Sequence, residues 1–244
     1  MNVKKWLSWR RYYWRCLLTK EGEYELRILR RYVPRDRIAV DVGANEGIYA
    51  YHLSRYANSV VAFEPNPHYD RALRFLPRNV TVRAEALSSA PGRLPLHIPA
   101  TDGGESEGWA TLEATDFPLS RSIDVPVRRL DDLELGRVGF MKIDVEGHEM
   151  AVLAGADATI RRDRPVLLVE AEDEHRAGAT SDLFRWASEH SYRGWFFQNG
   201  RAIPVEDFRV AEHQGRKTVG PGDVFRRQEL NYVNNFLCVP HHLI

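Results

Sequence analysis

The chain has 244 residues, of which 43% are hydrophobic and 28% charged, fractions typical of a globular domain with a sizeable core. Lysines plus arginines and aspartates plus glutamates number 34 each, so no nucleic-acid partner is expected. The cysteines, Cys16 and Cys238, form neither a disulfide framework nor a ligand cluster, and we expect no bound metal. Because the sequence shows no membrane-spanning run and no secretory signal, we expect a cytoplasmic protein.

Residues 1–33 form a basic and aromatic N-terminal extension. It contains no proline, and its apolar residues recur at helical spacing, so we expect one or two helices ending before Pro34. Residues 1–20 alternate aromatic rings with lysines and arginines, which suits peripheral contact with a membrane surface. We favour the alternative, in which the aromatic side packs over the ligand site or a second subunit and the arginines face solvent. Base stacking on nucleic acid is a weaker third reading.

Residues 34–244 are expected to form one α/β domain with a doubly wound, Rossmann-like sheet. Strands and helices alternate, which implies parallel strands joined by right-handed crossovers. The expected strands are 38–42, 59–63, 80–86, 140–145 and 166–171, and the expected helices are 47–57, 67–76, 149–160 and 181–189. A Pro- and Gly-rich section, 88–135, reads as an elaborated connection with short strands at 94–98 and 123–127. Residues 194–198 and 232–239 read as an antiparallel pair at the sheet edge.

The first strand runs into a glycine-containing turn, Asp41-Val42-Gly43-Ala44-Asn45-Glu46-Gly47. Glycines at such a turn let backbone amides approach a ligand at the positive end of the next helix. The spacing does not match the three-glycine fingerprint of dinucleotide binders, and no P-loop lysine follows. Asn45 stands where that fingerprint has a glycine, and asparagine tolerates the left-handed backbone that the turn needs.

The second strand ends in Phe63-Glu64-Pro65, where Glu64 lies 21 residues beyond Gly43. An acidic side chain at this neighbouring strand tip can accept hydrogen bonds from both hydroxyls of a ribose. The turn and Glu64 together predict an adenosine site.

Five segments in this order resemble the FkbM family of S-adenosylmethionine-dependent methyltransferases. They are Asp41–Tyr49, Phe63–Pro65, Ala86–Ser88, Leu130–Leu133 and Met141–Glu149, and a final strand, Asn231–Phe236, also looks familial. The resemblance implies a class I methyltransferase fold, with a seven-stranded sheet whose last strand is antiparallel. It also implies methylation of a hydroxyl on a sugar, glycolipid or secondary metabolite, with a small-molecule or glycan acceptor.

The same resemblance implies which residues bind S-adenosylmethionine. The turn would line the methionine and ribose side, Glu64 would hold the ribose, and the Ala86-Leu87 pair would flank the adenine, although Glu85 replaces an expected small polar residue. The expected cofactor-binding residues are Asp41, Gly43, Asn45, Gly47, Tyr49, Glu64, Pro65, Ala86, Leu87 and Asp144, the last beside the departing methyl group.

Methyl transfer requires an acceptor oxygen held behind the methyl carbon and a group that takes its proton. His148 is the natural proton acceptor near neutral pH, with Asp144 or Glu146 able to orient it. In the competing interpretation, Glu146 and His148 only cap or pair with the next helix. Glu170, which closes a buried strand at the same rim, is expected to bind the acceptor.

Two other function classes stay open on the sequence alone. One is a non-catalytic S-adenosylmethionine-binding partner subunit, which the intact cluster from Asp144 to Glu149 argues against. The other is an NAD-dependent enzyme acting on a nucleotide sugar, which should carry the absent three-glycine fingerprint. The acceptor itself is not named by the sequence, since acceptor pockets are built from loops, here expected at 101–117 and 200–230. A homo-oligomer also remains open.

Overall fold

The computed structural model describes residues 11, 13–15, 23–101, 104–114, 118–215 and 232–244. Its main sheet has the strand order β11-β10-β12-β9-β8-β1-β2-β3. The bounds are β1 (Ile38–Val42), β2 (Ser59–Phe63), β3 (Val80–Arg83), β8 (Val138–Ile143), β9 (Val166–Glu170), β10 (Tyr192–Gln198), β11 (Arg201–Pro204) and β12 (Asn235–Pro240). Strands β1, β2, β3, β8 and β9 pair in parallel, whereas β12 is antiparallel to both β9 and β10. The α/β class and the antiparallel last strand are therefore confirmed.

The main sheet has eight strands rather than the predicted seven. The additional strand is β11, which pairs antiparallel with β10 and forms the sheet edge. Asn199 and Gly200 join these two strands, and both have positive φ, of 50° and 75°. An Asn-Gly pair with this backbone is the preferred turn of a two-residue hairpin, so the sequence carried a signal for β11. The predicted partner of β10, β12, lies inside the sheet between β9 and β10 rather than at its edge.

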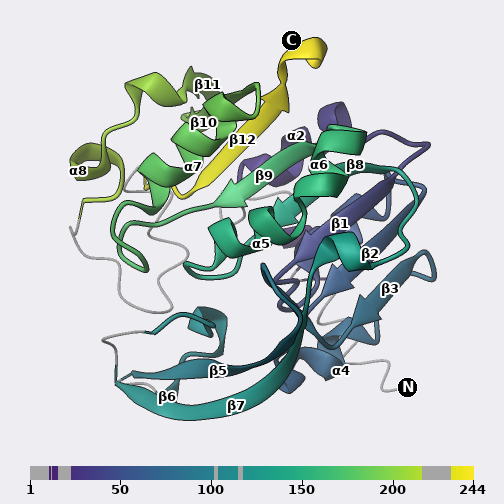
Figure 1. The fold of residues 1–244 in the computed structure, drawn as a ribbon, viewed down its shortest axis with the longest axis vertical. Helices are drawn as coiled ribbons and strands as arrows, with labels where there is room; N and C mark the ends of the chain where they lie inside the picture. The colour runs from purple at the N-terminus through teal and green to yellow at the C-terminus, as the bar shows by residue number, and fades with distance from the viewer. Residues whose placement is uncertain (1–10, 12, 16–22, 102–103, 115–117, 216–231) are drawn as a thin grey trace.

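Helices cover both faces of the main sheet (Figure 1). Helices α2 (Glu25–Tyr32), α3 (Ile48–Leu53) and α4 (Asp70–Leu73) bury side chains in one core with Ala39, Val60 and Leu168. Helices α5 (Glu149–Gly155), α6 (Asp157–Asp163) and α7 (Ala179–Glu189) share the second core with Val40, Val61 and Val169. A short helix, α8 (Val210–His213), follows β11. The predicted helix 149–160 is thus two helices, separated at Ala156.

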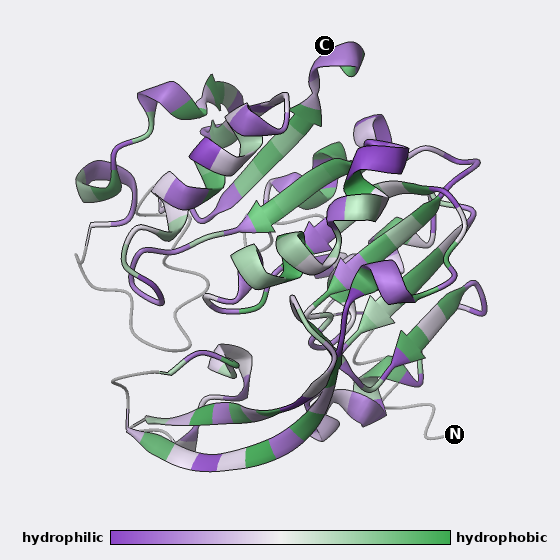
Figure 2. Ribbon diagram, viewed as in Figure 1, coloured by the Kyte–Doolittle hydropathy of each residue, from purple (hydrophilic) through white to green (hydrophobic). Residues whose placement is uncertain are grey.

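Strands covered on both faces are hydrophobic along their length, as parallel central strands must be. Every residue of β8, β9 and β12 is buried. Figure 2 shows β9 and β12 green along most of their length, whereas the second sheet alternates in colour. This difference separates the central sheet from the more exposed one.

The second sheet has the order β4-β7-β5-β6 and lies apart from the main sheet (Figure 1). Its strands are β4 (Ala86–Leu87), β5 (Gly92–Thr101), β6 (Gly104–Glu105) and β7 (Leu119–Arg128). The two predicted strands in this section are present but longer, and the predicted strand 80–86 divides into β3 and β4, which belong to different sheets. We call residues 92–128 the arm. Its buried side chains include Leu96, Ile98, Val125 and Val127.

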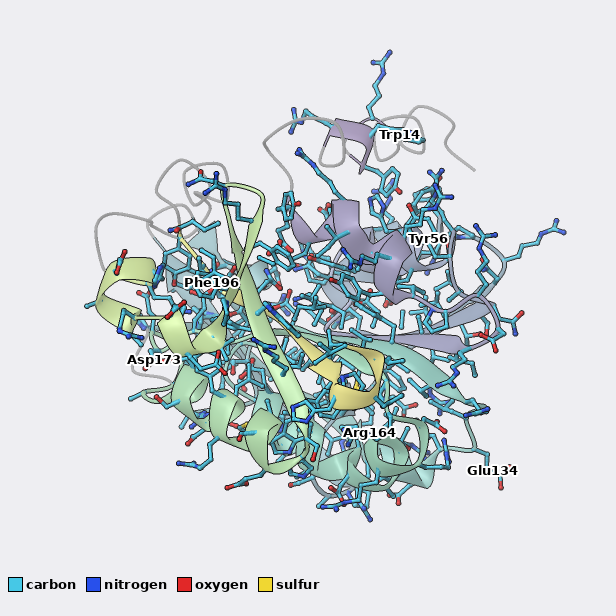
Figure 3. All side chains as sticks on the ribbon, turned by 90° about the horizontal axis from the view of Figure 1, so that it is seen from above. Trp14, Tyr56, Glu134, Arg164, Asp173 and Phe196 are labelled. Carbon is cyan, nitrogen blue, oxygen red and sulfur yellow. The ribbon has the colours of Figure 1, made fainter. Side chains whose placement is uncertain are left out.

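The described part of the N-terminal extension packs on α3. Tyr13 is fully buried, its hydroxyl lies 2.8 Å from Nδ1 of His52, and its ring centroid lies 4.0 Å from that of Tyr51. Trp14 contacts Arg55, and in the view from above it stands on the same side of the molecule as Tyr56 (Figure 3). Arg11 and Arg15 are exposed, as the packing interpretation expects. The residues 1–10, 12 and 16–22, including Cys16, lie outside the described residues.

Among the described helices, none has the length and apolarity needed to cross a membrane. Peripheral contact through residues 1–20 stays a prediction.

Candidate active site

The carboxyl ends of β1 and β8 touch each other directly. Gly43 follows β1 with φ +79°, and a Cβ there would lie only 1.7 Å from the carbonyl oxygen of Asp144. Asn45 and Gly47 also have left-handed backbones, with φ of 50° and 83°, and Gly47 caps α3. The sharp turn expected from the sequence is confirmed, and Gly43 is needed for the close packing of the β1 and β8 tips.

Glu64 joins the turns that follow β1 and β2. Its Oε2 accepts a hydrogen bond from the Asn45 amide at 2.7 Å, and its Oε1 accepts one from the Asn66 amide at 2.8 Å. Burial raises the pKa of Glu64 to about 7, although both amide hydrogen bonds oppose the shift. The amides fix the carboxylate in place, and each of its oxygens keeps a lone pair that can accept a ligand hydroxyl.

Asp41 lies at the end of β1 with only 1% of its surface exposed. Its Oδ2 has no hydrogen-bond partner among the described residues. Burial raises the pKa of Asp41 to about 7, against the lowering effect of Lys142. A buried carboxylate oxygen without a donor is uncommon, and it fits a site completed by a ligand.

Lys142, which the sequence analysis did not single out, is the central cation of the strand tips. It lies on β8 with no exposed surface, and its Nζ donates to Oδ1 of Asn235 at 2.8 Å. The same Nζ lies 3.5 Å from Asp144 Oδ2 and 3.6 Å from Glu170 Oε2. Burial alone would lower the pKa of Lys142, but the neighbouring carboxylates raise it above its ordinary value. Lys142 is therefore a protonated ammonium at neutral pH.

Asp144 and Glu170, two predicted catalytic residues, are brought together by this ammonium. The Asp144 side chain is 25% exposed and the Glu170 side chain 10%. Asn234 donates a short hydrogen bond to Oε1 of Glu170. Burial raises the pKa of Glu170 well above its ordinary value, and Asp144 adds to the shift. Of the predicted catalytic side chains at this rim, Asp144 is the most open to a ligand.

The segment before α2 also reaches this site. The Tyr49 hydroxyl and the Asn235 side-chain amide both donate hydrogen bonds to Glu23, the latter at 3.3 Å. Lys142 Nζ lies 5.0 Å from the centre of the Tyr49 ring. Residues before the expected domain boundary at 33/34 thus pack on the site rather than apart from it.

His148 and Glu146 diverge to different partners. His148 Nδ1 lies 2.6 Å from Oε1 of Glu113, and its Nε2 lies 2.9 Å from Oγ of Ser88. Glu146 Oε2 lies 2.9 Å from Nε2 of His175. The prediction that Asp144 or Glu146 orients His148 is therefore wrong, because the arm supplies Glu113 instead.

His175 is a second histidine at the site that the sequence reading missed, since it lies in the loop after β9. Burial lowers its pKa, but the hydrogen bond and charge of Glu146 dominate and raise it to about 9. Its ring centroid lies 5.5 Å from that of Trp109 in the arm. The loop after β9 thus presents an imidazolium at the strand tips.

The arm contacts the turns that follow two strands of the main sheet. On the β2 side, Asn66 Nδ2 donates to Oε2 of Glu107 at 2.8 Å. On the β8 side, the Thr111 hydroxyl donates to the carbonyl oxygen of Glu146 at 2.6 Å. The described part of the predicted acceptor loop 101–117 thus contacts the turns after β2 and β8, and its role in acceptor binding stays a prediction. The second predicted loop, 200–230, lies mostly outside the described residues.

The predicted adenine segment lies in β4. Ala86 and Leu87 are buried, with 7% and 1% exposure, and β4 pairs with β7 of the arm. Glu85, which replaces the expected small polar residue, forms ion pairs with Arg83 and Arg128. The adenine contacts of Ala86 and Leu87, and the donor contact of Pro65 beside Glu64, stay predictions.

The described residues contain no group of three His, Cys, Asp or Glu side chains that could hold a metal ion. Metal-independent activity stays a prediction.

Comparison with known proteins identifies the family. The family model named methyltransferase FkbM domain matches residues 41–193, a span that contains the glycine turn, Glu64, the arm and the β8 tip. The chain belongs to the FkbM family of S-adenosylmethionine-dependent methyltransferases. The NAD-dependent alternative is thereby overturned.

Relatives of this FkbM chain align over part of their length. It is 32% identical over 152 residues to the hexuronic acid methyltransferase AglP of Haloferax volcanii, covering 58% of this chain and 59% of that protein. It is 30% identical over 149 residues to Methyltransferase 1 of Beauveria bassiana, covering 51% and 60%. The chain thus spans about three fifths of the length of these relatives.

Among solved structures, methyltransferase FkbM from Methylobacillus flagellatus KT superposes with a TM-score of 0.53 at 17% identity. The superposition covers 83% of this chain and 43% of the other. This likeness supports the fold.

The residues at the strand tips fit the cationic adenosine donor of the FkbM family. Asp41 offers an unpartnered oxygen, and Glu64 has lone pairs available for ribose hydroxyls. Asp144 and Glu170 share the ammonium of Lys142, so the rim has a surplus of carboxyl groups over this cation. A sulfonium is a natural complement to that surplus.

Proposed function

We propose that this chain transfers a methyl group from S-adenosylmethionine to a hydroxyl oxygen of a sugar or sugar-derived acceptor. The observation that carries the proposal is the position of Asp144. Its carboxylate, with a side chain 25% exposed, stands at the β8 tip, and its main chain abuts Gly43. A hydroxyl held there would lie between the donor turn and the arm.

Donor binding uses the two strand turns. S-Adenosylmethionine supplies an electrophilic methyl group on its sulfonium. Glu64 accepts the ribose hydroxyls, the turn from Gly43 to Gly47 presents its backbone to the donor, and Ala86 and Leu87 give the adenine an apolar wall. Asp41 and Tyr49 line the methionine end.

Asp144 is the proposed proton acceptor. Lys142 is protonated, and the pKa of His175, which burial lowers but Glu146 raises to about 9, keeps that histidine protonated too at neutral pH. The Glu113 carboxylate accepts a hydrogen bond from His148 Nδ1. His148 Nε2 then accepts a hydrogen bond from the Ser88 hydroxyl rather than from the hydroxyl that is to be methylated. His148, the base expected from the sequence, is the alternative to Asp144.

Glu146 and Glu170 are proposed to orient the acceptor. Glu146 is held by His175 and Glu170 by Asn234, so both carboxylates have fixed positions beside the β8 tip. The arm, through Trp109 and Thr111, covers this side and limits access of water.

A sugar acceptor is favoured for two reasons. The relative AglP bears the name hexuronic acid methyltransferase. In addition, Trp109 is only partly buried in the arm, and an indole offers an apolar face to the C–H side of a sugar ring. A glycolipid and a secondary metabolite remain alternative hydroxyl acceptors.

The second candidate function is a non-catalytic donor-binding subunit. It is supported by the close engagement of His148 and Glu146 with structural partners. The discriminating experiment combines calorimetric titration of S-adenosylmethionine with mass-spectrometric detection of S-adenosylhomocysteine in the presence of hexoses and hexuronic acids. Donor binding without product from any hydroxyl acceptor would favour the subunit.

A further inference from the structure

Among the described residues, acidic and polar groups from several elements surround Lys142. The ion pairs to Asp144 and Glu170, at 3.5 and 3.6 Å, come from the tips of β8 and β9. The other charged or titratable groups that face it are Asp41 on β1, Glu23 before α2, Glu25 on α2 and Tyr49 on α3. Asn235 on β12 receives its hydrogen bond.

This arrangement is poorly explained as a structural ion pair. A buried ammonium is costly unless it is well paired, and a single carboxylate would balance its charge. Here one ammonium faces several carboxylates, which repel one another and favour proton uptake. A fixed ammonium and a second positive charge arriving with a ligand would together balance this carboxylate cluster, formed by Asp41, Asp144, Glu170 and Glu23.

We propose that Lys142 is a specificity-determining residue of the donor site, whose ammonium promotes ionisation of the carboxylate cluster and so favours a sulfonium donor over its neutral thioether product. This inference rests on the proposed function, because it assumes that the donor binds at the β8 tip. Lys142 acts through Asp144 and its neighbours, and it does not exchange a proton with the acceptor.

The test uses S-adenosylmethionine and S-adenosylhomocysteine as probes and requires no acceptor. Calorimetric dissociation constants for both are measured between about pH 6 and 9 in the wild type, Lys142→Met and Lys142→Gln. The protonation of each free ligand at a given pH is the same whichever variant is titrated, so differences between variants report on the protein. The glutamine variant keeps a donor for Asn235 and serves if the methionine variant does not fold. Asp124→Asn, a surface change on the arm, is the matched control.

In the wild type, the affinity ratio of donor to product should rise with pH as the cluster ionises. Without the ammonium, the cluster holds its protons to higher pH. Both Lys142 variants should therefore show a ratio about tenfold lower near pH 7 and a rise displaced upward by about one pH unit or more. Asp144 adds to the burial that raises the pKa of Asp41 and Glu170, so Asp144→Asn should move the rise to lower pH, and Asp124→Asn should change nothing.

Two results would overturn the inference. One is a wild-type ratio that is flat with pH. The other is a Lys142 variant that folds and keeps the wild-type ratio at every pH, or that weakens both ligands equally, as a purely structural lysine would. Failure of the wild type to bind either ligand would instead contradict the proposed function.

Discussion

Glu146 Oε2 lies 2.9 Å from Nε2 of His175, and this ion pair ties the loop after β8 to the loop after β9. Both loops border the β8 tip, and Thr111 of the arm bonds to the carbonyl oxygen of Glu146. Loss of this ion pair is therefore expected to affect both the stability of the fold and the position of the loops around the proposed acceptor site.

The ion pair predicts a pH-dependent stability. Burial lowers the pKa of His175, but Glu146 raises it to about 9, above the ordinary value of 6.5. A raised pKa contributes stability that is complete below about pH 6.5 and is lost as pH rises through about 9. Between these limits the wild type should lose roughly 1–3 kcal/mol more than His175→Gln, as measured by urea unfolding at each pH.

The control for this prediction is His241→Gln, which changes an exposed histidine near the C-terminus and should keep the wild-type pH dependence. Parallel stability curves for the wild type and His175→Gln would show that the pair contributes nothing.

The packing of Tyr13 predicts that the N-terminal extension stabilises the domain. Tyr13 is fully buried against His52 and Tyr51 of α3. Tyr13→Ala should lower the free energy of unfolding by about 2–4 kcal/mol through lost aromatic packing. Arg11→Ala, an exposed change in the same segment, should have little effect. If the two variants were equally stable, the packing interpretation would be wrong and membrane contact would be the favoured role of the segment.

The hydrogen bonds of Glu64 predict a loss of donor affinity on substitution. Glu64→Ala removes the ribose acceptor and leaves the Asn45 and Asn66 amides without their partner. The dissociation constant for S-adenosylmethionine should rise about 10- to 100-fold in calorimetric titration. Asp70→Ala, an exposed carboxylate on α4, is the matched control. Wild-type affinity in Glu64→Ala would remove Glu64 from the donor site.

The alternating strands and the glycine turn made the arrangement of the strand tips predictable. Hydrophobic runs in the sequence predicted β1, β2, β8 and β9. Because ligands of open sheets bind at the carboxyl ends of the strands, the sequence also placed four acidic residues at one edge of the sheet, where the structure has them: Asp41, Glu64, Asp144 and Glu170. Asn45 adopts the left-handed backbone expected of it. These features depend on local sequence and on a general rule of parallel sheets, so the chain alone could reveal them.

The partners across the site were not predictable in the same way. Glu113 reaches His148 from 35 positions away, and Asn235 reaches Lys142 from 93 positions away. Lys142 sits in a continuous hydrophobic strand, where a lysine gives no indication of which charges surround it. The fold of the arm brings Glu113 and Trp109 over the site, and the antiparallel insertion of β12 brings Asn235. Such contacts are set by tertiary packing rather than local pattern.

The exposure of Asp144 predicts which residue takes the acceptor proton. With an acceptor that the wild type methylates, Asp144→Asn should slow single-turnover transfer by about 10²–10⁴-fold near neutral pH. His148→Ala should slow it less than about tenfold, because Glu113 and Ser88 occupy both ring nitrogens. The reverse order of effects would restore His148 as the base.

The most direct test of the central claim is methyl transfer itself. Wild-type protein is incubated with S-adenosylmethionine carrying a deuterated methyl group, together with hexoses, hexuronic acids and their glycoside-linked forms, and products are followed by mass spectrometry. We expect one labelled methyl group on a hydroxyl oxygen of a sugar, formed in equal amount with S-adenosylhomocysteine and lost in Asp144→Asn. Donor binding with no labelled sugar, or transfer to an amine or thiol instead, would contradict the proposed function.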